Sequence, residues 1–102
     1  MVVVLPSRGG HANDIRELRR SLSQAPALAA LWWAGKGHWD AAHRLVMDAP
    51  GPEAAWVHAY LHRLDGDLDN AGYWYRLAGR PPAGGAPAAE WELIARELLG
   101  PC

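Results

Sequence analysis

The chain of 102 residues contains no phenylalanine and only one cysteine, Cys102, which is its last residue. One thiol cannot form an internal disulfide, so a disulfide-stapled fold is excluded and a reducing cytoplasm is the expected location. The aromatic residues are six tryptophans and three tyrosines. Each of them carries a polar atom that needs a partner when buried, so we expect polar groups inside the protein or an aromatic surface that binds something.

Positively and negatively charged residues are also nearly equal in number, which gives a formal net charge of −1 at pH 7. This balance removes the electrostatic attraction that draws proteins to nucleic acids or to anionic membranes. The apolar run at residues 1–5 is too short for a signal peptide, and no stretch approaches the length of a membrane-spanning helix. We therefore expect a protein with neither a nucleic-acid partner nor a membrane partner.

A skeleton of glycine and alanine recurs at an interval of 29 residues. Gly37 corresponds to Gly66, and Ala42 corresponds to Ala71. Glycine permits the left-handed turn between two helices, and alanine permits two helices to cross closely. The recurrence therefore predicts two stacked helical hairpins.

Apolar spacing and breaker residues predict helices throughout a single domain spanning 1–102. The expected helices cover 14–22, 26–34, 39–48, 52–64, 68–78 and 88–99. Residues 1–12 are expected to be loosely ordered, and the proline- and glycine-rich residues 80–87 to form a loop. Because the links are short, neighbouring helices should be antiparallel, and the fold class is all-α with five or six helices.

Residues 66–71 read Gly-Asp-Leu-Asp-Asn-Ala, and residues 37–42 read Gly-His-Trp-Asp-Ala-Ala. With Tyr75 and Ala78, these segments resemble the second half of the tetratricopeptide repeat, although the period is 29 instead of about 34 residues. That resemblance implies a helical binding module. The run Trp-Val-His-Ala-Tyr-Leu-His-Arg at 56–63, followed by Gly-Asp, Asn-Ala and Tyr-Trp-Tyr, also resembles a family of small bacterial helical proteins, and this second resemblance brings no activity with it.

Three histidines are the candidates for chemistry. His58 and His62 are four residues apart on one expected helix, so their side chains share a face and can bind one metal ion. His43 lies beside the inward stripe of the preceding helix and is the third candidate ligand. Three such imidazoles suit a divalent transition metal, with a position left open for substrate. His58 and His62 are equally candidates for metal-free acid–base catalysis, with Tyr60 as a polar neighbour.

Two other interpretations of the same histidines stay open. Their face of the helix could be the solvent face. Alternatively, they could be buried structural histidines bonded to tyrosine hydroxyls, carboxylates or carbonyls. The repeat register favours the inward face, because it places Ala55 and Ala59 against the partner helix. His58 and His62 then take positions where the repeat has large apolar residues.

The candidates for contact with a ligand or a partner are aromatic: Trp33, Trp39, Trp56, Tyr73 and Trp74. Packing inside the core is the alternative for each of them. Tyr73, Trp74 and Tyr75 are consecutive and cannot all lie on the same face of a helix. Of the three, Tyr75 belongs to the expected core stripe.

No motif fixes a reaction, since neither a phosphate-binding glycine loop nor a nucleophile elbow is present. The first functional hypothesis is a helical binding module that presents aromatic side chains to a protein partner, to a second copy in a homodimer, or to a small molecule. The second is a metal-binding protein or enzyme built on His43, His58 and His62. The third is a purely structural domain.

Overall fold

The computed structural model describes residues 12–100, with side chains from residue 24 onward, and five α-helices account for most of them. The helices are α1 (Ala12–Gly35), α2 (Trp39–Val46), α3 (Pro52–Leu64), α4 (Leu68–Ala78) and α5 (Pro87–Leu99). No strand occurs in this part of the chain, so the all-α prediction with five helices is confirmed. The loose ordering expected for residues 1–12 concerns residues that, apart from Ala12, lie outside the described range.

Helix α1 is one continuous helix, whereas the sequence suggested two helices separated near Pro26. A proline inside a helix removes one backbone hydrogen bond and disfavours the helical conformation of the residue before it. The segment that follows is rich in alanine, the best helix former, and its Ala27, Ala30 and Leu31 are buried in the core. The high helix propensity of alanine and the packing of these residues in the core together keep the helix continuous past Pro26.

The turns that join α1 to α2 and α3 to α4 have the same hydrogen bonds. The amide of Gly37 donates to the carbonyl of Ala34, and 29 residues later Gly66 donates to Arg63. Both glycines adopt a positive φ, +85° for Gly37 and +82° for Gly66, which a side chain would strain. The predicted equivalence of the two glycine turns is therefore confirmed.

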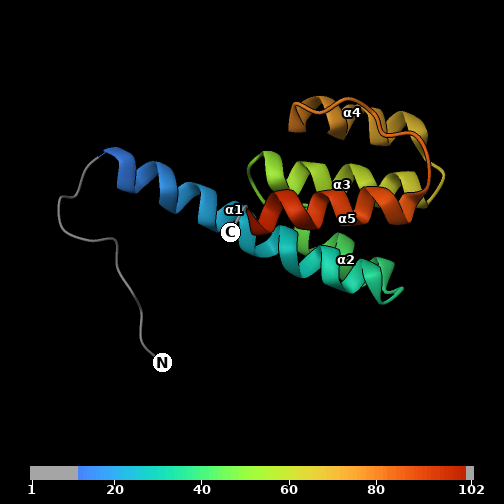
Figure 1. Ribbon diagram of the computed structural model, residues 1–102, viewed down its shortest axis with the longest axis horizontal. Helices are drawn as coiled ribbons and strands as arrows, with labels where there is room; N and C mark the ends of the chain where they lie inside the picture. Colours follow the sequence, from blue (N-terminus) through green and yellow to red (C-terminus); the bar gives the residue numbers. More distant parts are fainter. Residues whose placement is uncertain (1–11, 101–102) are drawn as a thin grey trace.

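Helix α3 lies at the centre of the bundle. It contacts α1, α2, α4 and α5, while α2 and α4 lie on either side of it and do not contact each other (Figure 1). Ala42 and Ala71, predicted at close helix approaches, are buried on α2 and α4. Helix α5 returns across the bundle and packs on α1 and α3.

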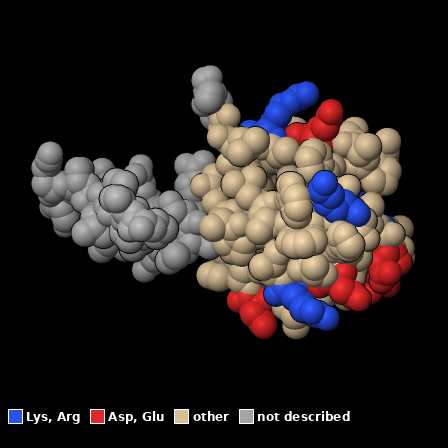
Figure 2. Space-filling view, turned by 90° about the horizontal axis from the view of Figure 1, so that it is seen from below, with Lys and Arg blue, Asp and Glu red and all other residues tan. Residues whose placement is uncertain are grey.

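The described helices are too short or too polar for any of them to cross a lipid bilayer. On the face shown in Figure 2, acidic and basic side chains are dispersed among uncharged residues. This distribution agrees with the nearly balanced charge of the sequence.

Candidate functional site

The central position of α3 buries a pair of histidines. Every residue from Ala54 to His62 is buried, because helices pack on several sides of α3. His58 is 3% exposed and His62 is 9% exposed. The inward orientation predicted from the repeat register is confirmed, and the solvent-facing alternative is wrong.

Helix α2 brings a third imidazole to this pair. The Nε2 atoms of His43 and His58 lie 3.1 Å apart. The ring centroid of His43 lies 4.8 Å from that of His58 and 5.4 Å from that of His62. One ring nitrogen from each of the three histidines falls within 4.8 Å of the others. The three residues singled out in the sequence thus form one cluster, which we call the histidine cluster.

Two tryptophans hold the imidazole rings by stacking. Trp39 lies one turn before His43 on α2 and stacks on it, with ring centroids 4.7 Å apart and an interplanar angle of 13°. Trp74 on α4 stacks on His58, with centroids 3.9 Å apart and an angle of 18°. The Trp39 Nε1–H donates to the carbonyl of Leu61 at 2.7 Å, which fixes the indole against α3. Aromatic contacts thereby orient the rings from both sides of α3.

The cluster leaves two polar atoms without a partner. The Nδ1 atoms of His58 and His62 are buried and accept or donate no hydrogen bond. Structural histidines, as well as metal ligands, ordinarily have such atoms bonded to a carbonyl or carboxylate. The expected hydrogen-bond partners on tyrosine, carboxylate or carbonyl are absent at these two nitrogens, and their burial has an energetic cost whichever role the histidines have.

The surroundings keep the buried imidazoles neutral. Burial, followed by the charges of the nearby His62 and His43, lowers the pKa of His58 from 6.5 to about 4. Burial also lowers the pKa of His62, with His43 adding to the effect, while Asp67 and Asp65 act in the opposite direction. A neutral imidazole is the form that binds a metal ion, so at neutral pH these rings need not lose a proton first.

The distances within the cluster fit a small metal ion. Bonds of 2.0–2.1 Å in a tetrahedral arrangement place ligand nitrogens about 3.4 Å apart. The 3.1 Å separation of His43 and His58 is close to this value. The 4.8 Å limit for the full set requires a side-chain adjustment of at most about 1.4 Å around the ion.

The structure does not bring Tyr60 to the histidines. Tyr60 is buried on another face of α3, where it lines a groove with Trp32 of α1 and Trp91 of α5. Burial raises the pKa of its hydroxyl, as does the nearby Glu90. Tyr60 is therefore placed too far round the helix to act beside His58.

The other predicted aromatic contacts are also dispersed. Trp33 lies near the end of α1 and makes edge contacts with Trp32 and with His38, the residue before α2. Trp56 is buried beneath the guanidinium of Arg80. Tyr73 is exposed and touches Trp74 by its edge. Of the five aromatic residues proposed as a binding surface, only Trp39 and Trp74 lie against the histidine cluster.

A buried polar network escaped the sequence analysis. Glu90 on α5 is 4% exposed, accepts a hydrogen bond from the Tyr75 hydroxyl at 2.5 Å and pairs with Arg63 Nη1 at 2.8 Å. Arg63 also donates to the carbonyl of Gly85 in the loop before α5. The signal was present, because Glu90 precedes the inward residues Ile94 and Leu98 by four and eight positions. Burial, followed by the hydrogen bond to Glu90, raises the pKa of Tyr75.

Comparisons with protein-family models, with curated proteins and with solved structures found no significant match. Function is therefore inferred from the geometry of the chain itself.

Proposed function

We propose that this chain is a cytoplasmic metal-binding protein that holds one divalent transition-metal ion at His43, His58 and His62. The observation that carries the proposal is the convergence of three ring nitrogens within 4.8 Å from two neighbouring helices. Burial of His58 and His62 adds to it, because it lowers their pKa values and so favours the neutral imidazole that binds a metal ion.

Zinc is the first candidate for the ion. Imidazole suits zinc, copper, nickel and iron, and a site of three histidines with a free fourth position is a common zinc arrangement. In the described part of the chain no carboxylate or thiol joins the three-residue cluster, which disfavours magnesium and calcium. A bound zinc ion would supply Lewis-acid chemistry at the free position.

The stacked tryptophans support a preorganised site. Trp39 on His43 and Trp74 on His58 restrict ring rotation, so less conformational entropy is lost when the ion binds. Stacking here takes the orienting role that a hydrogen bond on the second ring nitrogen has in other sites.

The test is metal content and affinity in protein purified without a metal-affinity tag. Elemental analysis should find about one ion per chain, and calorimetry with Zn²⁺ should give one tight site. His58→Ala and His62→Ala should each weaken Zn²⁺ binding by well over about tenfold. The matched control is His38→Ala, an exposed histidine outside the cluster, which should bind as the wild type does. Wild-type protein that takes up neither Zn²⁺ nor Cu²⁺ would refute the proposal.

The second candidate is the helical binding module, and one specific observation favours it. A groove of about 880 Å³ lies between the carboxyl ends of α1 and α3 and the start of α5. It is lined by aromatic and aliphatic side chains, among them Trp32, Tyr60, Leu64 and Trp91, and Trp32 is 54% exposed. A second copy of the chain is the partner that we favour for it, because the groove carries both Lys36 and Glu92, and a twofold contact can pair each with its opposite on the other copy.

A further inference from the structure

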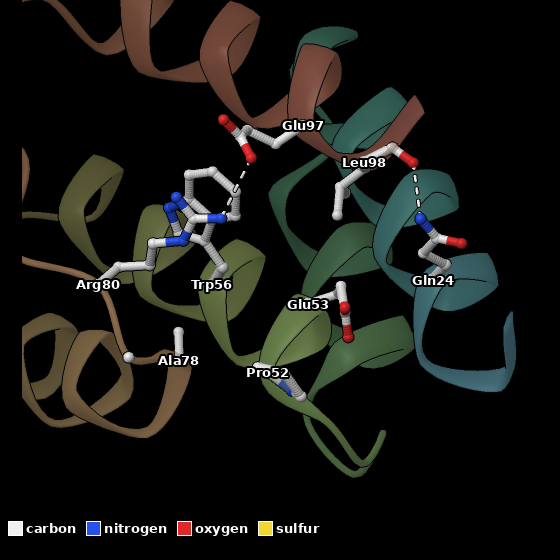
Figure 3. A pocket seen from close by; sticks show the side chains of 9 residues that line it. Gln24, Pro52, Glu53, Trp56, Ala78, Arg80, Glu97 and Leu98 are labelled. Carbon is white, nitrogen blue, oxygen red and sulfur yellow. Dashed lines mark hydrogen bonds and ion pairs between the residues drawn. The ribbon is translucent and has the colours of Figure 1, made fainter. Parts of the chain in front are cut away.

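The first half of α1 extends beyond the rest of the bundle. Gln24, midway along the helix, donates from Nε2 to the carbonyl of Leu98 near the end of α5, at 2.7 Å (Figure 3). On the amino-terminal side of this hydrogen bond, α1 continues past the other helices (Figure 1). We call residues 12–23 the arm of α1 and residues 24–35 its bundle half. Each is half of the 24-residue helix and about 18 Å long.

The face of α1 that packs in the bundle is apolar only in the bundle half. Ala27, Ala30 and Leu31 are buried there. The arm has polar residues at the positions one and two heptads before these three, namely Asn13, Arg16, Glu17, Arg20 and Ser23. The arm therefore does not continue the buried face of its own bundle.

A second apolar stripe follows the opposite face along the whole helix. Its residues alternate at intervals of three and four, and we call them the α1 stripe: Ile15, Leu18, Leu22, Ala25, Ala29 and Trp32. This spacing is the a and d pattern of a coiled coil. Helix geometry places the stripe nearly opposite Ala27 and Leu31. In the bundle half the stripe is uncovered, because Ala25 is exposed and the Trp32 side chain is 54% exposed.

The sizes of the stripe residues favour pairing with an antiparallel copy of the same helix. Leu18 and Leu22 lie in the arm, whereas Ala25 and Ala29 lie in the bundle half. An antiparallel alignment about the midpoint of α1 would place Leu22 level with the partner's Ala25, and Leu18 level with the partner's Ala29. Each large residue then has a small one opposite it, which fills the layers evenly. A parallel alignment would place alanine against alanine and leave voids.

The ends of the same alignment also match. Ile15 would be level with the partner's Trp32, whose ring has the Lys36 ammonium 5.1 Å from its centroid. Asp14 would lie within about one turn, or 5 Å along the axis, of the partner's Lys36. A twofold contact repeats this pairing of opposite charges at both ends.

We propose that α1 is a dimerisation helix, in which the arm of each copy packs along the bundle half of α1 in the other copy as an antiparallel coiled coil. A second copy of this chain is the occupant because the two halves of α1 are equal in length and complementary in side-chain size. The proposal also names the segment that meets Trp32 at the edge of the groove. It rests on α1 and needs no metal.

The first experiment measures the dimer by sedimentation equilibrium of the full chain in the presence of a chelator. Leu18→Glu should weaken self-association about tenfold to hundredfold, because it replaces a buried apolar side chain by a charge. Ser23→Glu is the matched control, because it adds the same charge to the arm at a position outside the α1 stripe. This control should dimerise as the wild type does.

The second experiment determines the orientation of the helices by cross-linking, in chains that also carry Cys102→Ser. Leu18→Cys and Ala29→Cys proteins are mixed in equal amounts and oxidised with oxidised glutathione, which accepts the two electrons released when the disulfide forms. The antiparallel alignment predicts a disulfide between the two different variants, identified by mass. A parallel alignment predicts that each variant cross-links with itself.

Three results would overturn the proposal: a wild-type chain that is monomeric at millimolar concentration, a folded Leu18→Glu protein that dimerises as the wild type does, and Leu18→Cys protein that cross-links only with itself. If Leu18→Glu does not fold, by circular dichroism, Leu18→Ala takes its place. Calorimetry with Zn²⁺ on the same variant separates this proposal from the metal site, since we expect dimerisation to be lost while Zn²⁺ binding is kept.

Discussion

The side chain of His58 contacts residues from both helices that flank α3. It stacks on Trp74 of α4 and approaches His43 of α2 at 3.1 Å, while its own Nδ1 has no partner. A group so placed is favourable only when neutral, and this gives the metal-free protein a specific dependence on pH.

We expect the free energy of unfolding of the metal-free protein to fall as the pH falls from about 6.5 toward 5. The pKa of His58 is lowered to about 4 in the folded chain, below its unfolded value of 6.5, so the unfolded chain binds the proton first. The loss is at most about 1.4 kcal/mol per pH unit for this residue, and His62 adds a loss of the same sign. Urea unfolding with a chelator present measures it.

A substitution of His58 isolates its contribution to the dependence of the unfolding free energy on pH. His58→Leu should flatten the dependence between pH 6.5 and 5, a window chosen because most carboxylates titrate below it. His38→Ala should keep the wild-type slope. A wild-type protein whose stability is constant across this window would show that His58 is not buried as described.

Replacing His62 by leucine should stabilise the metal-free protein by about 0.5–2 kcal/mol while abolishing metal binding. The Nδ1 of His62 is a buried polar atom without a hydrogen bond, so its removal orphans no partner. Urea unfolding and calorimetry with Zn²⁺ on the same sample measure the two effects. A loss of stability in the metal-free variant would mean that His62 has a structural partner after all.

Helix α5 depends on one buried carboxylate for its attachment. Glu90→Ala would leave the Arg63 guanidinium and the Tyr75 hydroxyl without their partner, in a setting where Glu90 is 4% exposed. We expect a loss of about 3 kcal/mol in the free energy of unfolding, as for other broken buried pairs. Glu97→Ala, in an exposed pair on the same helix, should cost less than about 1 kcal/mol. Thermal unfolding that ranks the two variants the other way would contradict this account.

Both helical hairpins could be predicted from the sequence. For α5 the sequence predicted the helix but not its position in the bundle. Gly37 and Gly66 mark turns whose geometry is dictated locally, because a positive φ strongly favours glycine. The place of α5 on α1 and α3 follows from long-range contacts, such as the hydrogen bond from Trp91 Nε1 to the Leu31 carbonyl. No local pattern encodes a contact across 60 residues. The helix break predicted near Pro26 was wrong for the same reason, because burial of the residues after Pro26 outweighs the tendency of proline to end a helix.

The histidine cluster was predictable because its spacing is helical. His58 and His62 share a face by periodicity, and His43 joins them through the register of adjacent helices. The stacking of Trp74 on His58 and the unbonded Nδ1 atoms were not predictable, because they depend on side-chain rotamers. Tyr60 was misplaced because two residues along a helix rotate a side chain by about 200° away from His58.

The groove between α1, α3 and α5 is the surface that we propose for self-association. We expect reversible dimers at high protein concentration in sedimentation equilibrium, because burying the 54% exposed Trp32 is favourable. Trp32→Ala should shift the protein to monomers. Leu68→Ala, an exposed leucine at the start of α4 away from the groove, should leave the dimer intact. A wild-type protein that stays monomeric at millimolar concentration would leave the groove without this partner.

The position of the histidine cluster within the chain has a consequence for the order in which the protein folds. Every residue that forms or stacks on it lies between Trp39 and Trp74, and its contacts between helices span 15 to 23 residues. Helix α5 closes the bundle through contacts that span 60 and 74 residues. Contacts between residues close together in the chain cost less loop-closure entropy and form earlier in folding. We therefore expect the two hairpins to come together first during refolding, and α5 to dock on them last.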